Sequence, residues 1–111
     1  MVFIESRIFT RELRRAAKQE ADAVLNAIQN ELLENPECGD VVPGLGGIRK
    51  ARAVNPLTGK GKRGGFRYLF LYLEHKSHIH LLYLYGKGQQ IDLSNDEKLA
   101  LRALVSQIKQ G

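Results

Sequence analysis

The spacing of apolar residues predicts helices in the first third of the chain. Within residues 11–34 they recur three or four positions apart, which places one stripe of a helix in a core and the rest in water. Thr10 is the expected N-cap, and Pro36 ends the pattern because the residue before proline disfavours the α conformation. A break near Lys18 and Gln19 would divide this segment into a helical hairpin. The stripe comprises Leu13, Ala17, Ala21, Val24, Leu25, Ile28 and Leu32.

A different pattern predicts strands before and after these helices. Residues 2–4 form a short apolar, β-branched run, and residues 48–54 alternate, with Lys50 and Arg52 on the face opposite Ala51 and Ala53. Residues 66–73 are apolar at nearly every position, as expected for a central strand covered on both faces. Residues 79–85 are expected to return antiparallel to them after a polar turn.

The remaining segments complete an α+β pattern. Residues 37–47 and 55–65 are rich in glycine and are expected to be loops, while Ser94 and Glu97 have the spacing of a capping box for a last helix through Lys109. We therefore expect a single domain over residues 1–111. It should have a small twisted, mainly antiparallel sheet of about four strands, an N-terminal helical hairpin and a C-terminal helix. The helices would cover one face of the sheet and leave the other partly open.

Positive charge is concentrated in one part of this chain. The sequence has 17 basic and 12 acidic residues, yet residues 41–73 contain no acidic residue at all. Outside that window, ten basic residues stand against twelve acidic ones, so the positive excess lies within it. Such a segment attracts polyanions through Coulomb steering and counterion release. The cations of the window are Arg49, Lys50, Arg52, Lys60, Lys62, Arg63 and Arg67.

Arg67 is the most informative of these cations. Taken singly, strand cations such as Lys50 and Arg52 are usually solvated surface charges. A guanidinium within an apolar strand needs an anionic partner, which could be a bound phosphate or a structural carboxylate such as Glu74 or Asp92. The glycine-rich loop that holds Lys60, Lys62 and Arg63 also suits phosphate binding, although it could simply be a flexible basic hairpin loop.

Other classes of function find little support in the sequence. No apolar run reaches the roughly 20 residues of a membrane helix, and Cys38 has no second cysteine for a disulfide, so we expect a cytoplasmic protein. His75, His78 and His80 suggest a metal site, but no cysteine or carboxylate nearby completes a tetrahedral set, which favours surface histidines. We expect no metal and no other cofactor.

A series of short motifs runs in order along nearly the whole chain: Phe3-Ile4-Glu5-Ser6, Ile8-Phe9, Asn35-Pro36, Gly39-Asp40-Val41, Gly46-Gly47-Ile48-Arg49-Lys50, Gly59-Lys60-Gly61-Lys62-Arg63-Gly64-Gly65 and Leu84-Tyr85-Gly86-Lys87. Together these motifs resemble the HigB branch of the RelE toxin superfamily. The resemblance implies a compact α+β fold and a toxin of a type II toxin–antitoxin system that cuts messenger RNA on the translating ribosome. It also implies a cognate antitoxin, usually a small helix-turn-helix protein.

The resemblance also implies the chemistry of an endoribonuclease. In this superfamily the RNA 2′-hydroxyl attacks the adjacent phosphate without a metal, which needs a base, cations around the phosphorane and a group that stabilises the leaving oxygen. The family's catalytic cations fall on Lys50, Arg52, Arg67 and Lys87, and Lys50 beside Arg52 is our first candidate for the base. RNA or ribosome contacts are expected from Arg49, Lys60, Lys62, Arg63 and Tyr85.

Two alternatives use the same basic face without cleavage. One is a non-catalytic module that binds nucleic acid, and the other is an inactive family member retained for antitoxin or operator binding. The arrangement of Lys50, Arg52, Arg67 and Lys87 separates them from a nuclease. Cations that converge over one concave face favour cleavage, whereas cations spread along a stripe favour binding alone.

Overall fold

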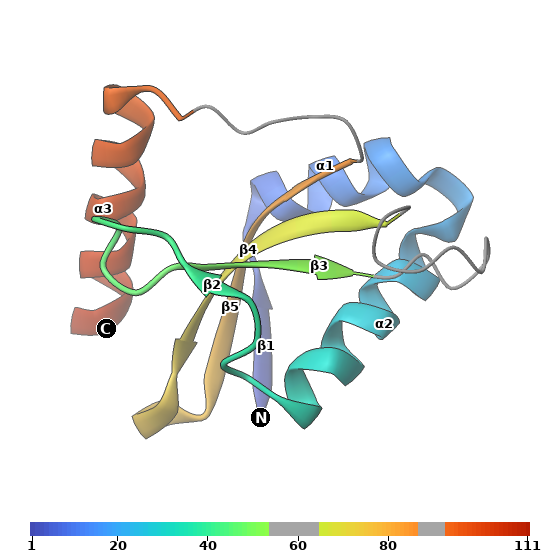
Figure 1. Cartoon of the computed structure of the whole chain (residues 1–111), viewed down its shortest axis with the longest axis horizontal. Coiled ribbons are helices and arrows are strands. Elements are labelled where there is room, and N and C mark those ends of the chain that lie inside the picture. The colour runs from blue at the N-terminus through green and yellow to red at the C-terminus, as the bar shows by residue number, and fades with distance from the viewer. Residues whose placement is uncertain (54–64, 87–92) are drawn as a thin grey trace.

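The computed structural model describes residues 1–53, 65–86 and 93–111, and it places helices on both faces of a central sheet (Figure 1). The sheet has five strands in the order β1-β5-β4-β3-β2. The elements are β1 (Val2–Glu5), α1 (Arg7–Ala17), η1 (Lys18–Glu20), α2 (Ala21–Glu34), β2 (Asp40–Val41), β3 (Arg49–Ala53), β4 (Phe66–Leu73), η3 (Glu74–Lys76), β5 (His78–Tyr85) and α3 (Asn95–Gln110). This architecture confirms the α+β prediction.

The N-terminal helical hairpin is confirmed, but its first helix begins earlier than predicted. Ser6, not Thr10, is the N-cap of α1: its Oγ accepts a hydrogen bond of 3.0 Å from the Phe9 amide and donates one of 2.9 Å to the Leu82 carbonyl. Thr10 lies inside the helix, where its hydroxyl donates to Glu5. The break falls at Lys18, whose φ of 53° is incompatible with a continuing helix.

The four predicted strands are present, and a fifth is added. β4 lies in the middle of the sheet, antiparallel to both β3 and β5, while β1 pairs parallel to β5. The additional strand, β2, falls within residues 37–47, which were expected to be a loop. It pairs with β3 through only two residue pairs, Asp40 with Lys50 and Val41 with Arg49. A two-residue strand is too short to show an alternating pattern in the sequence.

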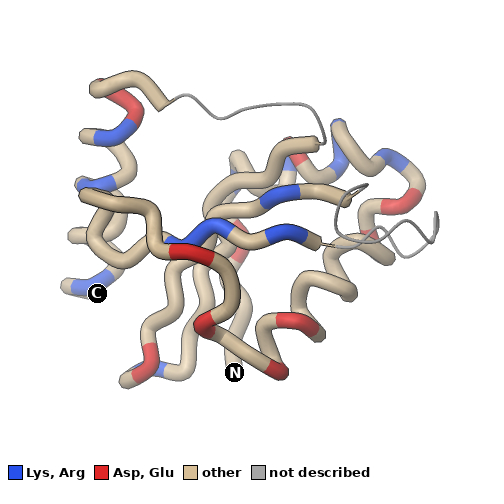
Figure 2. Tube along the Cα trace, viewed as in Figure 1, with Lys and Arg blue, Asp and Glu red and all other residues tan. Residues whose placement is uncertain are grey.

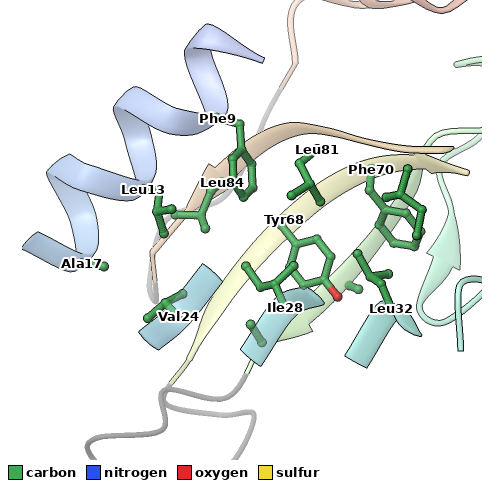
Figure 3. Close-up of a cluster of buried hydrophobic side chains, with 13 residues drawn as sticks. Phe9, Leu13, Ala17, Val24, Ile28, Leu32, Tyr68, Phe70, Leu81 and Leu84 are labelled. Carbon is green, nitrogen blue, oxygen red and sulfur yellow. The ribbon is translucent and has the colours of Figure 1, made fainter. Parts of the chain in front are cut away.

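Two apolar cores, one on each face, hold the sheet between the helices. On one face α1 and α2 pack on the sheet through Phe9, Val24 and Ile28 against Tyr68 and other strand residues (Figure 3). On the opposite face, the core formed by Leu45, Ile48, Leu69, Leu71, Leu73, Leu82 and Val105 joins α3 to the sheet. The expectation that all helices share one face is therefore wrong for α3, whose apolar stripe needs a surface of its own. None of the helices in the described ranges could span a bilayer.

Candidate active site

Strands β3 and β4 bring together three of the predicted catalytic cations. Arg52 lies directly opposite Arg67 in the antiparallel register, and Lys50 is two residues from Arg52 on the same face. Lys50 and Arg52 are exposed while Ala51 and Ala53 are buried, as the alternating pattern predicts. In Figure 2 basic segments lie side by side on these two strands. Residues 15 or more positions apart in sequence thus become neighbours through strand pairing.

These three cations line one pocket of about 270 Å³. The pocket lies beside the part of β3 that β2 does not reach. The first residue of β2, Asp40, pairs with Lys50, and the described residues give Ala51 to Ala53 no partner on that side. Both β3 and the segment after α2 therefore contribute to its wall. The complete described lining is Glu31, Cys38, Gly39, Asp40, Lys50, Ala51, Arg52 and Arg67.

The pocket cations have no ion pair with an acidic side chain of the described ranges. Ion pairs within 4.0 Å in those ranges join Glu12 to Arg11 and to Arg15 on α1. Glu74, one of the two carboxylates considered for Arg67, lies beyond the opposite end of β4, about 20 Å away along a strand of this length. The other, Asp92, lies outside the described residues. Like charges in directly opposed strand positions repel each other, so an anion bound here would relieve that repulsion.

Tyr85 lies beside the two guanidinium groups. It is opposite Arg67 in the β4–β5 register and only 6% exposed. Burial raises the pKa of Tyr85, while the charges of Arg67 and Arg52 act in the opposite direction. Its ring centroid lies 6.4 Å from that of Tyr83. In this position the hydroxyl is near the pocket cations, but the ring has little exposed surface on which a base could stack.

Arg49 has a structural role in the fold. Alternation along β3 places it on the face opposite Lys50, and its Nη1 donates hydrogen bonds to the carbonyls of Glu37 (2.8 Å) and Gly39 (3.3 Å). These bonds attach the segment after α2 to β3. RNA binding by Arg49 stays a prediction. Four other predicted residues, Lys60, Lys62, Arg63 and Lys87, lie outside the described residues.

Gly39 brings the segment after α2 directly against β3. Its φ is +75°, and a Cβ at this position would lie 2.1 Å from the Lys50 carbonyl oxygen. No side chain fits in that space, so glycine is required both by the backbone conformation and by the close approach. The sequence motif Gly39-Asp40-Val41 is thereby explained: it sets the wall of the pocket next to Lys50.

Sequence reasoning missed the carboxylate of this pocket. Glu31 of α2 accepts a 2.5 Å hydrogen bond at Oε1 from the hydroxyl of Tyr68, whose ring is fully buried between the sheet and the helices (Figure 3). Burial and this hydrogen bond raise the pKa of Tyr68. The Cys38 thiol lies 3.9 Å from both Glu31 Oε1 and Tyr68 Oη. The only sequence signal was an acidic residue beside the buried positions Ile28 and Leu32 on α2.

Two other groups of polar residues do not bring together cations from separate strands as this pocket does. A wider hollow of about 680 Å³ is lined by Arg7, Arg11, Arg14 and Arg15, but these cations come from a single helix and form a stripe along α1. The rings of His78 and His80 lie 6.4 Å apart on β5, and burial lowers the pKa of His80. No three metal-binding side chains of the described ranges are grouped to hold an ion.

Comparison with known proteins agrees with the fold and the motifs. The family model of the RelE toxin of the RelE / RelB toxin–antitoxin system matches residues 5–110, nearly the whole chain. The chain belongs to the RelE toxin family. Membership of the RelE superfamily confirms the resemblance predicted from the motifs, and the narrower assignment to the HigB branch stays a prediction.

Solved RelE structures share the fold at low sequence identity. A double arginine-to-alanine mutant of E. coli toxin RelE in the free state is 14% identical, with a TM-score of 0.57 and coverage of 93% of this chain and 94% of that one. The isolated E. coli RelE toxin is 15% identical, with a TM-score of 0.56 and coverage of 93% of this chain and 97% of that one. The intact E. coli RelBE toxin–antitoxin complex is 16% identical, with a TM-score of 0.55 and coverage of 80% of this chain and 98% of that one. At these identities the likeness concerns the RelE fold, and the chemistry must be argued from this chain's own residues.

Proposed function

We propose that this RelE-family chain is the toxin component of a type II toxin–antitoxin system and cleaves messenger RNA on the ribosome. One observation carries the proposal: Lys50, Arg52 and Arg67 come from two strands, line a single pocket and have no ion pair with an acidic side chain of the described ranges. A phosphodiester placed there would neutralise charges that otherwise repel each other. Convergence of this kind suits a reaction centre better than a stripe that only binds RNA.

The cations would act on the phosphate during attack by the adjacent 2′-hydroxyl. As the phosphorane forms, negative charge grows on its non-bridging oxygens, and a pair of guanidinium groups held on opposed strands can donate hydrogen bonds to them. Lys50 adds a third cation on the same face, and Lys87 is proposed as the fourth catalytic cation. The products would be a 2′,3′-cyclic phosphate and a 5′-hydroxyl, and the reaction would use no metal or other cofactor.

The proposal extends to the partners of the toxin. Arg49, Lys60, Lys62, Arg63 and Tyr85 are proposed to contact RNA on the ribosome, which places the protein in the cytoplasm. E. coli RelE is known in an intact complex with RelB, and by analogy this chain would bind a cognate antitoxin, which we expect to be a small helix-turn-helix protein. Neutralisation would require the antitoxin to keep RNA away from the pocket.

Replacement of Arg67 by alanine tests the proposal. Loss of one preorganised donor to the transition state costs about 3 kcal/mol, so Arg67→Ala should lower the rate of ribosome-dependent cleavage roughly a hundredfold and relieve growth inhibition. The matched control is Lys76→Ala, which removes a cation from η3 at the opposite end of β4 and should leave both activities unchanged. Equal toxicity and equal cleavage by wild type and Arg67→Ala would reject a catalytic pocket at this place.

A further inference from the structure

We propose that Glu31 is the general base that takes the proton from the attacking 2′-hydroxyl. This inference rests on the proposed ribonuclease function and names a proton acceptor, which the two arginines of the pocket cannot supply. A guanidinium group has hydrogen-bond donors only, so neither Arg52 nor Arg67 can accept a proton. The base must come from another side chain of the same pocket.

The position of Glu31 meets the first requirement of a base, which is access to the reacting groups. Glu31 is on α2, on the face of the sheet that α1 and α2 cover, yet it lines the same pocket as Lys50, Arg52 and Arg67. This is possible because β2 begins only at Asp40, opposite Lys50, and no described strand pairs with Ala51 to Ala53 on that side of β3. A ribose in the pocket would therefore have cations on one side and this carboxylate on the other.

The hydrogen bond from Tyr68 fixes the orientation of the carboxylate. The Tyr68 ring is fully buried, and its hydroxyl donates to Oε1 at 2.5 Å. A carboxylate has about four acceptor positions on its two oxygens, so beside the Tyr68 bond and the Cys38 thiol at 3.9 Å it has room for a hydrogen bond from a 2′-hydroxyl. Tyr68 is thus a positioning residue, since it acts on the RNA only through Glu31.

Asp40, the second carboxylate of the pocket, is less suited to this role. It is exposed on the two-residue strand β2, and none of the hydrogen bonds between described side chains holds its carboxylate in place. A catalytic base must be kept within hydrogen-bond reach of one particular proton, and an exposed side chain on a short edge strand is not. The structure therefore assigns the role to Glu31 rather than to Asp40. Lys50, which the sequence had suggested, is exposed on β3 and as an ammonium group has donors only, whereas a carboxylate accepts a proton directly.

The proposed step balances as a transesterification. The 2′-O–H bond breaks and its proton moves to Glu31, while the 2′-oxygen forms a bond to phosphorus and the bond between phosphorus and the 5′-oxygen breaks. A water molecule protonates the leaving 5′-oxygen, and Glu31 returns its proton to the resulting hydroxide. No oxidant, reductant or metal enters this balance. The three cations stabilise the phosphorane and take no proton from the RNA.

Chemical rescue tests the assignment with a readout that a purely structural role would not move. Positioned general bases contribute about a hundredfold or more, so Glu31→Ala should lower the single-turnover cleavage rate by at least that factor while ribosome binding persists. Added formate, a small carboxylate that can enter the vacated space, should restore part of the rate, whereas chloride at equal ionic strength should not. Arg67→Ala should not respond to formate, because it lacks a cation rather than a base.

Three further variants keep the test decisive. Glu34→Gln makes the same charge change on an exposed position of α2 outside the pocket and should cleave like wild type. Tyr68→Phe keeps the carboxylate, so its single-turnover cleavage rate should fall less than tenfold, a smaller loss than that of Glu31→Ala. Glu31→Gln can still accept the Tyr68 hydrogen bond, so it answers the question if Glu31→Ala does not fold.

Each result separates this inference from the proposed function. Cleavage by Glu31→Gln at the wild-type rate would overturn the inference while leaving the ribonuclease intact. A loss in Glu31→Ala that formate does not repair, matched by an equal loss in Tyr68→Phe, would also overturn it and make Glu31 a structural residue. No cleavage by the wild-type protein on programmed ribosomes would instead be a failure of the proposed function itself.

Discussion

The opposed pair Arg52 and Arg67 should make the folded protein less stable than it could be. The two residues are directly opposite in an antiparallel register and have no ion pair with an acidic side chain of the described ranges. We predict that Arg67→Gln and Arg52→Gln each raise the free energy of unfolding at low salt. A change that damages activity while it improves stability is typical of groups placed for function.

The size of the effect follows from the geometry. Directly opposed residues have Cβ atoms about 5 Å apart, and two unit charges about 6 Å apart repel by about 0.7 kcal/mol in a medium as polar as water. This agrees with the roughly 0.2–1 kcal/mol found for cross-strand pairs. For a domain of this size the gain corresponds to a rise of a few degrees in Tm. Because each single change removes the same repulsion, the double variant should gain less than the sum of the two.

The free energy of unfolding of the two single variants and the double variant can be measured by urea titration. The titrations are made at low salt and at about 1 M salt, where the Debye length falls to roughly 3 Å. The gain should shrink at high salt. Arg102→Gln makes the same charge change on an exposed position of α3 and should have little effect. Lower stability in both single variants, or gains in the double variant that simply add, would show that the two guanidinium groups do not repel each other.

Two predictions concern the residues around the pocket. Gly39→Ala should lower the free energy of unfolding by more than Gly44→Ala does. Both glycines have φ near +75°, but only at Gly39 would a Cβ lie 2.1 Å from the Lys50 carbonyl oxygen. Equal losses of stability in urea titrations would contradict a clash at Gly39. Burial and its bond to Glu31 raise the pKa of Tyr68. Above pH 10, the ordinary pKa of tyrosine, the folded state therefore keeps a proton that the unfolded chain loses, and stability should fall by about 1.4 kcal/mol per pH unit. Tyr68→Phe should remove this fall in stability. If the free energy of unfolding of Tyr68→Phe fell above pH 10 as steeply as that of the wild type, the fall would not come from Tyr68.

Local pattern was enough to predict most of the fold, and pairing between strands accounts for the rest. Alternation along residues 48–54 placed Lys50 and Arg52 on one face, and the capping residues Ser94 and Glu97 marked the start of α3. Each of these two signals is contained within a few consecutive residues. The opposition of Arg52 and Arg67 is set by the register of β3 on β4, which no local signal contains.

The contribution of α2 to the pocket was harder still to predict. Glu31 meets Tyr68 across 37 sequence positions, and on the helix it is one acidic residue among several. The start of α1 was misplaced for a related reason: the hydroxyl of Ser6 is held by the Leu82 carbonyl, 76 positions away, so the helix begins before its apolar stripe becomes regular. Sequence patterns thus gave the cations of the site but not the carboxylate that faces them.

The central claim is that the pocket cations act on a phosphate attacked by its own neighbouring 2′-hydroxyl. The most direct measurement uses ribosomes programmed with a messenger RNA that has a single 2′-deoxynucleotide immediately before the cleaved bond. Cleavage at that bond should stop, while the all-ribose message should be cut to a 2′,3′-cyclic phosphate and a 5′-hydroxyl. Cleavage of the deoxy-substituted bond at an unchanged rate would contradict it.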